Sequence, residues 1–361
     1  MHITETNPPR ELRVATSRYA TMSSRASRWT LCIFTAFALL SVATSLSRYR
    51  ISFKDRVQNA SDLELYWAEV HRVANGESYY QAASEELTAR GHPTINLFNW
   101  RTPLPMWLLA KLPDPEYGRW ILASLGVCLL VFGVLASYRE GSLHQGLWSG
   151  IFLSGMTILC LMGNLYVSPI LWASVLLGLS LCAYCFDRVG LAVFLGTAAI
   201  IFRELAMPYC LLMVAIAVWR RQRSELFLWS LGLAGFAIYY FVHAWHVARF
   251  AGTDQIASTN RWTQFNGLPA VIGSAQNGFL LLFPQWVTAV YLACALLGLG
   301  GWHSLFGLRV AGTAILFLTT FAIIGRDVNQ YWGTLVTSVL CLGAARAPAS
   351  FCELMRAAAR P

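Results

Sequence analysis

Acidic and aromatic residues that follow the first apolar stretch are the first candidates for chemistry. They read Ser61-Asp62-Leu63-Glu64-Leu65-Tyr66-Trp67. In a helix, Asp62, Tyr66 and Glu69 would share one face, because they lie at positions i, i+4 and i+7. A carboxylate there could accept a proton from a hydroxyl group or help to hold a divalent ion. The same spacing also fits the solvated face of an amphipathic helix, so both interpretations are open at this point.

Two arginines stand where polar sequence meets apolar sequence. Arg101 lies in Asn99-Trp100-Arg101-Thr102-Pro103-Leu104-Pro105, and Arg203 precedes Glu204 in the otherwise uncharged stretch 191–212. A guanidinium in such a place can grip a phosphate through two parallel hydrogen bonds, and an arginine that snorkels beside a tryptophan would look the same. Ionisable groups inside membrane segments usually face a cavity or a partner. We therefore interpret Arg101, Arg203 and Glu204 as candidate ligand-binding residues, with a mutual ion pair at a turn as the alternative for the last two.

Further polar residues lie at turns between apolar stretches. Asn164 stands in Gly163-Asn164-Leu165-Tyr166, His243 lies three residues before His246, and Arg326-Asp327 precedes Tyr331. Two histidines without a third ligand nearby are a weak signal for zinc, so no metal is assigned to them. The candidate substrate-binding residues from this group are Asn164, His243, Arg326 and Asp327. Interfacial polar residues or helix ends are the alternatives.

The composition indicates that a membrane protein carries these residues. Hydrophobic residues make up 56% of the 361 residues and charged residues only 12%, with a mean hydropathy of +0.50. Soluble domains carry about 25% charged residues, so this chain would expose too much apolar surface in water. The net charge of +9 comes almost entirely from arginine. Basic residues collect at the cytoplasmic ends of membrane spans, which explains this charge without a nucleic-acid partner.

The predicted fold is all-α, a polytopic transmembrane helical bundle of about ten spans. Residues 1–28 are expected to be a disordered basic cytoplasmic tail, and residues 347–361 a cytoplasmic C-terminal tail. The bundle occupies 29–346 and includes a long extracytoplasmic loop at 47–102, followed by a short proline-containing segment at the second membrane entry. The expected spans are 29–46, 119–137, 146–163, 167–186, 189–203, 205–219, 226–244, 277–299, 304–325 and 331–346.

The arginines also orient the predicted bundle. With the N-terminus inside, most arginines of the short loops fall in the cytoplasm, among them Arg139, Arg188 and Arg220. All of the candidate residues named above then lie at the extracytoplasmic ends of the spans. The expected location is the bacterial inner membrane, with a site that faces outward.

Taken together, these motifs resemble the GT-C superfamily of polyprenyl-phosphate-sugar-dependent glycosyltransferases, in particular glycosyltransferase family 87 (the DUF2029 type of mannosyltransferase). The resemblance covers roughly residues 30–225. The chain departs from the family where asparagine replaces the usual glutamine, at Asn164, and where Arg203-Glu204 replaces a common lysine. The matching parts are Asp62 to Tyr66, Gly76, Tyr79-Tyr80, Asn99 to Pro105, Gly163 to Tyr166, Pro208 after Arg203-Glu204, and Trp219 to Arg223.

The resemblance implies a cell-envelope enzyme that transfers a sugar, with mannose as a candidate, from a polyprenyl-phosphate donor to an extracytoplasmic glycan or lipid acceptor. It implies Asp62 as general base, Glu64 as the fallback carboxylate, and Arg101 and Arg203 as the groups that neutralise the departing phosphate. No cofactor is certain, and a divalent metal is the one candidate. A transporter or flippase of an anionic or lipid-linked substrate is an alternative, as is a non-catalytic partner in a membrane assembly. The other residues expected at the substrate site are Tyr66, Asn164, Glu204, His243, Arg326 and Asp327.

Overall fold

The computed structural model describes residues 17–47, 54–251, 265–324 and 327–361. Within these ranges no residue lies in a strand, which confirms the predicted all-α class. The α-helices are α1 (Ser24–Ser47), α2 (Lys54–Ala74), α3 (Tyr79–Ala89), α4 (Pro103–Ala110), α5 (Tyr117–Glu140), α6 (Leu143–Leu161), α7 (Pro169–Cys185), α8 (Val189–Phe202), α9 (Met207–Trp219), α10 (Arg223–Phe250), α11 (Gly267–Ala275), α12 (Gln285–Gly300), α13 (Leu305–Ile323) and α14 (Thr337–Ala358). The 3₁₀ helices are η1 (Arg18–Thr21), η2 (Leu97–Asn99), η3 (Leu165–Val167), η4 (Glu204–Ala206), η5 (Gly278–Leu282) and η6 (Asp327–Val336).

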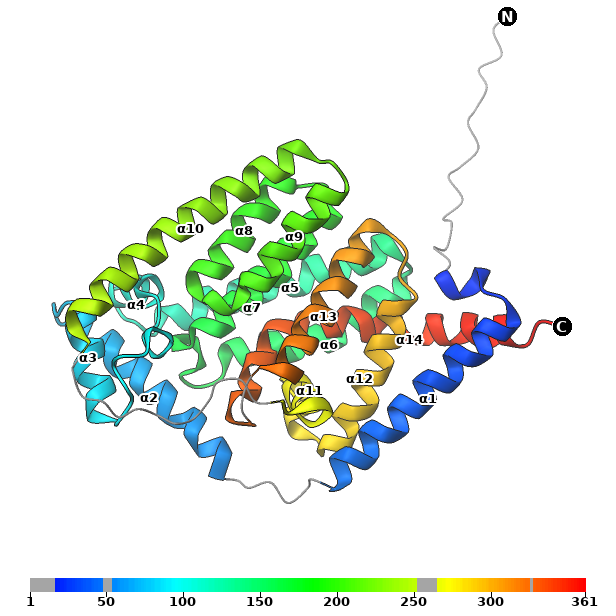
Figure 1. Ribbon diagram of the computed structural model, residues 1–361, viewed down its shortest axis with the longest axis horizontal. Coiled ribbons are helices and arrows are strands. Elements are labelled where there is room, and N and C mark those ends of the chain that lie inside the picture. The colour runs from blue at the N-terminus through cyan, green and yellow to red at the C-terminus, as the bar shows by residue number, and fades with distance from the viewer. Residues whose placement is uncertain (1–16, 48–53, 252–264, 325–326) are drawn as a thin grey trace, which may run out of the picture.

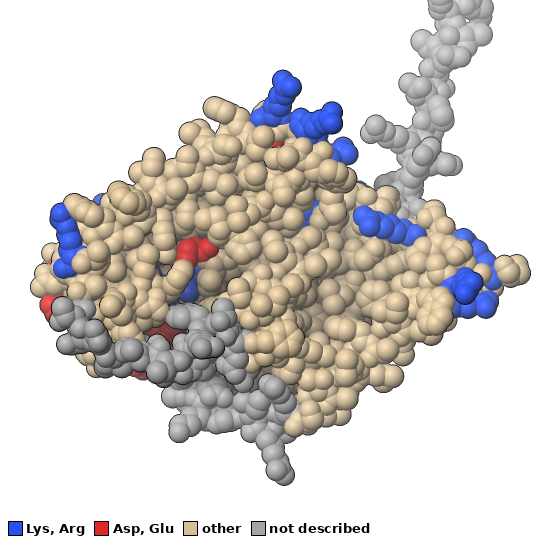
Figure 2. Space-filling view, in the orientation of Figure 1, with Lys and Arg blue, Asp and Glu red and all other residues tan. Residues whose placement is uncertain are grey.

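Several of these helices have the length and composition of membrane spans, as expected of an integral membrane protein. Five are long and apolar enough to cross a bilayer: Ser24–Ser47, Tyr117–Glu140, Arg223–Phe250, Leu305–Ile323 and Asn329–Ala358. Four shorter apolar helices accompany them: Pro169–Cys185, Val189–Phe202, Glu204–Trp219 and Gln285–Gly300. Figure 2 shows a broad uncharged face with basic side chains mainly near its margins, as a lipid-facing belt would require.

The centre of the bundle is α7. All 17 of its residues are buried, and α8 packs beside it (Figure 1). A helix that is apolar all round must be covered by other helices or by lipid, and here other helices cover it. Nearby, α12 crosses α14 so closely that a Cβ at Gly298 would lie 1.9 Å from the carbonyl oxygen of Gly343. Glycine at that crossing is therefore required by the approach of the two backbones.

Part of the predicted N-terminal tail is ordered, and most of the predicted C-terminal tail is helical. Residues 17–28 fold against the bundle: the Tyr19 hydroxyl donates to the Leu297 carbonyl at 3.0 Å, and the Arg18 amide donates to Gly301 at 2.9 Å. The predicted disorder across 1–28 is therefore wrong for these residues, and 1–16 lie outside the described part. At the other end, α14 continues to Ala358 with Leu354 buried, so most of 347–361 is helical.

The predicted spans 277–299 and 331–346 also begin differently. Pro284 separates η5 from α12, because proline cannot donate the amide hydrogen bond that a continuous helix needs. The start of the second segment belongs to η6, a 3₁₀ helix that leads into α14. Asn277, which precedes η5, and Tyr331, which lies in η6, both line the wall of a cavity.

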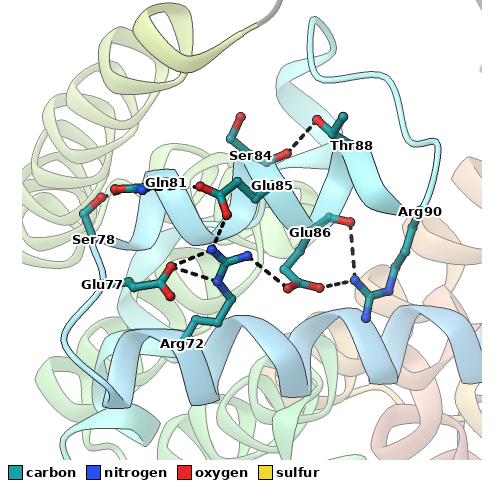
Figure 3. Close-up of polar contacts among 9 residues, drawn as sticks. All are labelled: Arg72, Glu77, Ser78, Gln81, Ser84, Glu85, Glu86, Thr88 and Arg90. Atoms are coloured by element: carbon teal, nitrogen blue, oxygen red, sulfur yellow. Dashed lines mark hydrogen bonds and ion pairs between the residues drawn. The ribbon is translucent and has the colours of Figure 1, made fainter.

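The long predicted loop is itself helical. Helices α2 and α3 form a hairpin whose turn contains Gly76, with a φ of +96° that favours glycine. Arg72 on α2 joins the hairpin through ion pairs with Glu77, Glu85 and Glu86 (Figure 3). Together with α4, this hairpin lies at one end of the bundle, next to the C-terminal end of α10 (Figure 1).

A buried ion pair ties α10 to α13. Arg309 donates from Nη2 to both carboxylate oxygens of Glu225 at 2.8 Å, and both side chains are almost fully buried. The Tyr184 hydroxyl donates to the same carboxylate at 2.7 Å and accepts from the Trp229 indole at 2.8 Å. Arg309 also lies over the Tyr184 ring at 3.9 Å. The network therefore joins α7, α10 and α13.

We predict that Arg309→Met destabilises the bundle, because it leaves the Glu225 carboxylate buried without its cation. The expected cost is about 3–5 kcal/mol. The double variant Arg309→Met/Glu225→Gln should recover most of that loss, since no unpaired charge remains. Thermal unfolding of the detergent-purified proteins measures both effects. A single variant as stable as the wild type would show that the ion pair does not hold the helices together.

Candidate functional site

Arg101 is the centre of the candidate site. It lies between η2 and α4, where Pro103 at the first turn of α4 fixes the direction in which the chain enters the bundle. Its side chain is buried at 9% exposure. Nε donates to the Tyr66 hydroxyl at 2.6 Å, and Nη1 donates to the Phe98 carbonyl at 2.7 Å. The Arg101 carbonyl accepts from the Tyr79 hydroxyl at 2.5 Å, so both hairpin helices hold this residue.

No carboxylate in the described part of the chain lies within ion-pair distance of Arg101. Asp62 and Glu204 act on it electrostatically from farther away. Removing a cation from water without a bonded anion is costly, and the hydrogen bonds to a hydroxyl and a carbonyl offset this only in part. An anionic ligand at this place would therefore gain the full benefit of a charge that is already desolvated.

Arg101 does not itself line a cavity, but its partner Tyr66 lines one of about 320 Å³. Asp62 and Tyr66 enter its wall from α2, and Tyr331 and Thr334 enter from η6. Burial raises the pKa of Tyr66 above its ordinary value, so this hydroxyl keeps its proton. Because it accepts from Arg101, its own proton is available to a further acceptor in the cavity.

The two predicted catalytic carboxylates face different surroundings. Asp62 is partly buried and lines the cavity, whereas Glu64 is exposed. Two positions along a helix correspond to a rotation of about 200°, which is why neighbouring carboxylates separate in this way. The geometry therefore favours Asp62 as the carboxylate of the site, and Glu64 does not line the cavity.

A second, apolar hollow adjoins the cavity. It has a volume of about 980 Å³ and lies among α6, η5, α12 and α14, with Phe152, Trp286 and Tyr291 in its wall. Asn277 lines both hollows. Its amide donates to the Ser274 carbonyl at 2.8 Å, so the junction is held in place. We call this hollow the α6–α12–α14 groove.

Arg203 and Glu204 form an ion pair at the end of α8. Nη1 of Arg203 lies 2.6 Å from Oε1 of Glu204, and Arg203 is 4% exposed. Thr102, the neighbour of Arg101, donates to the Ile201 carbonyl at 2.7 Å near the end of α8, so the pair lies close to Arg101, although neither Arg203 nor Glu204 lines the cavity. Since Glu204 already neutralises it, Arg203 is a weaker phosphate ligand than the sequence suggested.

His243 lies inside α10 rather than at its end, because the helix continues to Phe250. Its Nδ1 is 3.3 Å from the Tyr80 hydroxyl, while its buried Nε2 has no partner. The Tyr80 ring stacks on His246 with centroids 4.7 Å apart. These contacts join α10 to α3.

The remaining predicted residues contribute less to this arrangement. Asn164 is exposed at the start of η3 and does not line the cavity. Arg326 lies outside the described residues, and Asp327 opens η6 with a side chain that is not described. Across the described part of the chain, no three His, Cys, Asp or Glu side chains meet in a group that could hold a metal ion. We therefore assign no metal ligands.

Glu69 has a buried carboxyl group, which the sequence did not predict. It is on α2, is 2% exposed, and its Oε2 has no hydrogen-bond partner. Burial raises its pKa to about 8, against an opposing effect of Arg101. The side chain is therefore mostly protonated at neutral pH. The sequence shows that Glu69 lies two helical turns after Asp62, on the same face. It does not show that the side chain is buried, because burial depends on packing against other segments.

We predict that the Glu69 carboxyl group makes the free energy of unfolding fall as the pH rises from 4.5 to about 8. The folded pKa is above the unfolded value, so the stabilisation is complete below the unfolded pKa of 4.5 and is lost as pH rises to about 8. The slope in that window is about 1.4 kcal/mol per pH unit. Glu69→Gln should remove this slope, as measured by melting temperatures from pH 5 to 8. Parallel pH profiles for variant and wild type would contradict the assignment.

Comparisons of the chain with protein-family models, with curated proteins and with solved structures found no match. The function must therefore be argued from the site itself.

Proposed function

We propose that this protein is an integral membrane glycosyltransferase of the GT-C type, which transfers a sugar from a polyprenyl-phosphate donor to an extracytoplasmic acceptor. The observation that carries the proposal is Arg101, a buried guanidinium without a bonded carboxylate beside a cavity that contains Asp62. A phosphate would supply the missing anion through charge-assisted hydrogen bonds. The Tyr66 hydroxyl supports the same role, because its proton can be donated to a phosphate oxygen.

The neighbouring groove supports a lipid-linked donor. The head of such a molecule is polar and its tail is a long hydrocarbon chain. The Asp62 cavity and the α6–α12–α14 groove meet at Asn277, so one molecule could place its head in the first and its tail in the second. Burial of the tail supplies affinity that does not depend on the sugar.

The proposed reaction needs a base and a stabilised leaving group. An acceptor hydroxyl attacks the anomeric carbon of the donor sugar, and the bond from that carbon to the phosphate oxygen breaks. Its electron pair leaves with polyprenyl phosphate, where the Tyr66 hydroxyl, with Arg101 behind it, stabilises the developing charge. The hydroxyl proton passes to Asp62, which lines the same cavity.

A ten-span arrangement agrees with the contacts at the helix ends. At the end assigned to the cytoplasm, the Glu140 carboxylate accepts from Trp302 at 3.0 Å, and Arg346 donates to the Glu140 carbonyl at 3.1 Å. The hairpin ends that follow α6 and α8 lie instead near α2 and α4. The proposed spans are the five long apolar helices, the four shorter ones and α6. We place the protein in the bacterial inner membrane with the Asp62 cavity outward.

Two features weigh against the alternatives. A transporter needs a path that opens to both sides, whereas the buried Arg309–Glu225 pair joins three helices near the opposite end. A non-catalytic assembly partner would leave Asp62 exposed and far from Arg101, whereas Asp62 is partly buried on the helix that bonds to Arg101.

We predict that Asp62→Asn lowers sugar transfer by about 10²- to 10⁴-fold, the usual contribution of a positioned general base. The matched control is Glu64→Gln, which makes the same kind of change on an exposed neighbour and should leave activity unchanged. The assay follows radiolabelled sugar from polyprenyl-phosphate donors into membrane or glycan fractions, at equal expression of each variant. Full activity in Asp62→Asn would remove this residue from the mechanism, and equal loss in both variants would show that the effect is not specific to the cavity.

A further inference from the structure

The two ends of the described chain bring five exposed arginines to one place. Arg28, near the start of α1, donates from Nε to the Ala358 carbonyl at the end of α14 at 3.0 Å. Arg360 donates from Nη2 to the Ala20 carbonyl of η1 at 2.9 Å. These bonds run in opposite directions between the two ends, so they hold the ends side by side. We call this surface the terminal arginine patch, and its arginines are Arg18, Arg25, Arg28, Arg356 and Arg360.

The positive charge of the patch is not neutralised by bonded carboxylates. Among the described residues, no carboxylate lies within ion-pair distance of any of the five arginines. Glu353, which lies nearby on α14, accepts instead from the backbone amide of Ser17 at 2.6 Å. Arg28 and Arg360 also keep N–H donors beyond their bonds to carbonyls, because a guanidinium carries five. The patch can therefore bind an anion through charge-assisted hydrogen bonds.

The patch lies where the membrane spans end. Helices α1 and α14, whose ends it joins, both belong to candidate membrane spans. Bulky apolar side chains beside the arginines are exposed: Trp29 at 63%, Phe351 at 48% and Met355 at 47%. In a bilayer such side chains lie in lipid, and the charged ends of the arginines next to them reach the level of the headgroups. Figure 2 shows basic side chains gathered at the end of the molecule where α1 and α14 meet in Figure 1.

The chemistry of the patch selects an anionic phospholipid. A zwitterionic headgroup carries a cation of its own, which the arginines repel, whereas an anionic headgroup presents its phosphate without one. Basic residues beside a membrane span attract anionic lipids by about fivefold in affinity for each residue. A nucleic acid or an acidic protein would meet the same charge. Neither would cover the apolar side chains beside it, which the hydrocarbon of a lipid does.

We propose that the terminal arginine patch binds the phosphate of an anionic phospholipid, and that this lipid holds α1 against α14. Helix α1 is the least buried of the five long candidate spans, so attachment through a shared headgroup matters most for this helix. A phosphate that accepts from arginines of both chain ends joins them through a charge that neither end supplies. The binding is independent of the proposed sugar transfer and of which end of the bundle faces the cytoplasm.

The test compares two photoreactive lipids in nanodiscs that contain the full-length protein. One is a diazirine-tagged phosphatidylglycerol, which is anionic, and the other is a diazirine-tagged phosphatidylcholine, which is zwitterionic and reports ordinary bilayer contact. Peptide mass spectrometry locates each adduct. Melting temperatures in nanodiscs of each lipid show whether the anionic lipid also stabilises the fold.

Two triple variants separate this site from a general effect of charge. The first removes three patch arginines and keeps Arg28 and Arg360, whose bonds to carbonyls hold the chain ends together. The second removes the same charge from exposed arginines at the turn between α9 and α10. The variants are Arg18→Gln/Arg25→Gln/Arg356→Gln and Arg220→Gln/Arg221→Gln/Arg223→Gln.

We expect phosphatidylglycerol to label segments 24–33 and 348–358 at least about fivefold more than phosphatidylcholine does. The patch variant should lose this preference and the higher melting temperature in anionic nanodiscs, and the control variant should keep both. Equal labelling of the wild type by the two lipids would overturn the proposal, whatever the variants do, as would an equal loss in both variants. Displacement of the label by a soluble poly-glutamate peptide at equimolar concentration would also overturn it, because the patch would then prefer an acidic protein.

Discussion

A charge inside an apolar bundle must find a partner, and the rest of the structure follows from how this chain provides partners. Arg309 lies against Glu225, and Arg203 lies against Glu204. Arg346 donates to two neutral oxygens, the Glu140 carbonyl and the side-chain oxygen of Gln145. Arg101 is likewise held by neutral oxygens, but it differs from Arg346 in lying behind Tyr66, which lines a cavity, so its charge is available to a ligand there. The proposed site is thus defined by an arginine without a bonded carboxylate that is joined through Tyr66 to a cavity.

The helical hairpin of α2 and α3 makes that arrangement stable. Arg72 joins its two helices through three carboxylates, and Tyr79 from α3 and Tyr66 from α2 then reach Arg101 from two sides. A loop without this hairpin could not keep a buried guanidinium in one position, since each hydrogen bond would compete with water. The segment that the sequence marks as polar is therefore the structural support of the site.

The sequence predicted the parts of this site that depend on local pattern. Asp62 and Tyr66 are four residues apart, and a helix brings them to one face whatever surrounds it. Arg101 stood out because it interrupts apolar sequence. Asn277 was only the first residue of an expected span, and Glu69 was only a member of the Asp62 face, which could equally be solvated. Their roles depend on packing between segments far apart in the chain. The ordered residues 17–28 were missed for the same reason, because Tyr19 is fixed by a carbonyl 278 positions away.

The central claim is that Arg101 recognises a lipid phosphate, and the most direct measurement compares two lipids that differ only in that group. Affinities of the purified wild type and of Arg101→Met are measured for a polyprenyl phosphate and for the corresponding polyprenol. Loss of charge-assisted hydrogen bonds should weaken binding of the phosphate by about 1.5–3 kcal/mol, or ~10- to ~100-fold, and leave binding of the alcohol unchanged. Equal affinities of both proteins for the phosphate, or an equal loss for both lipids, would contradict the account.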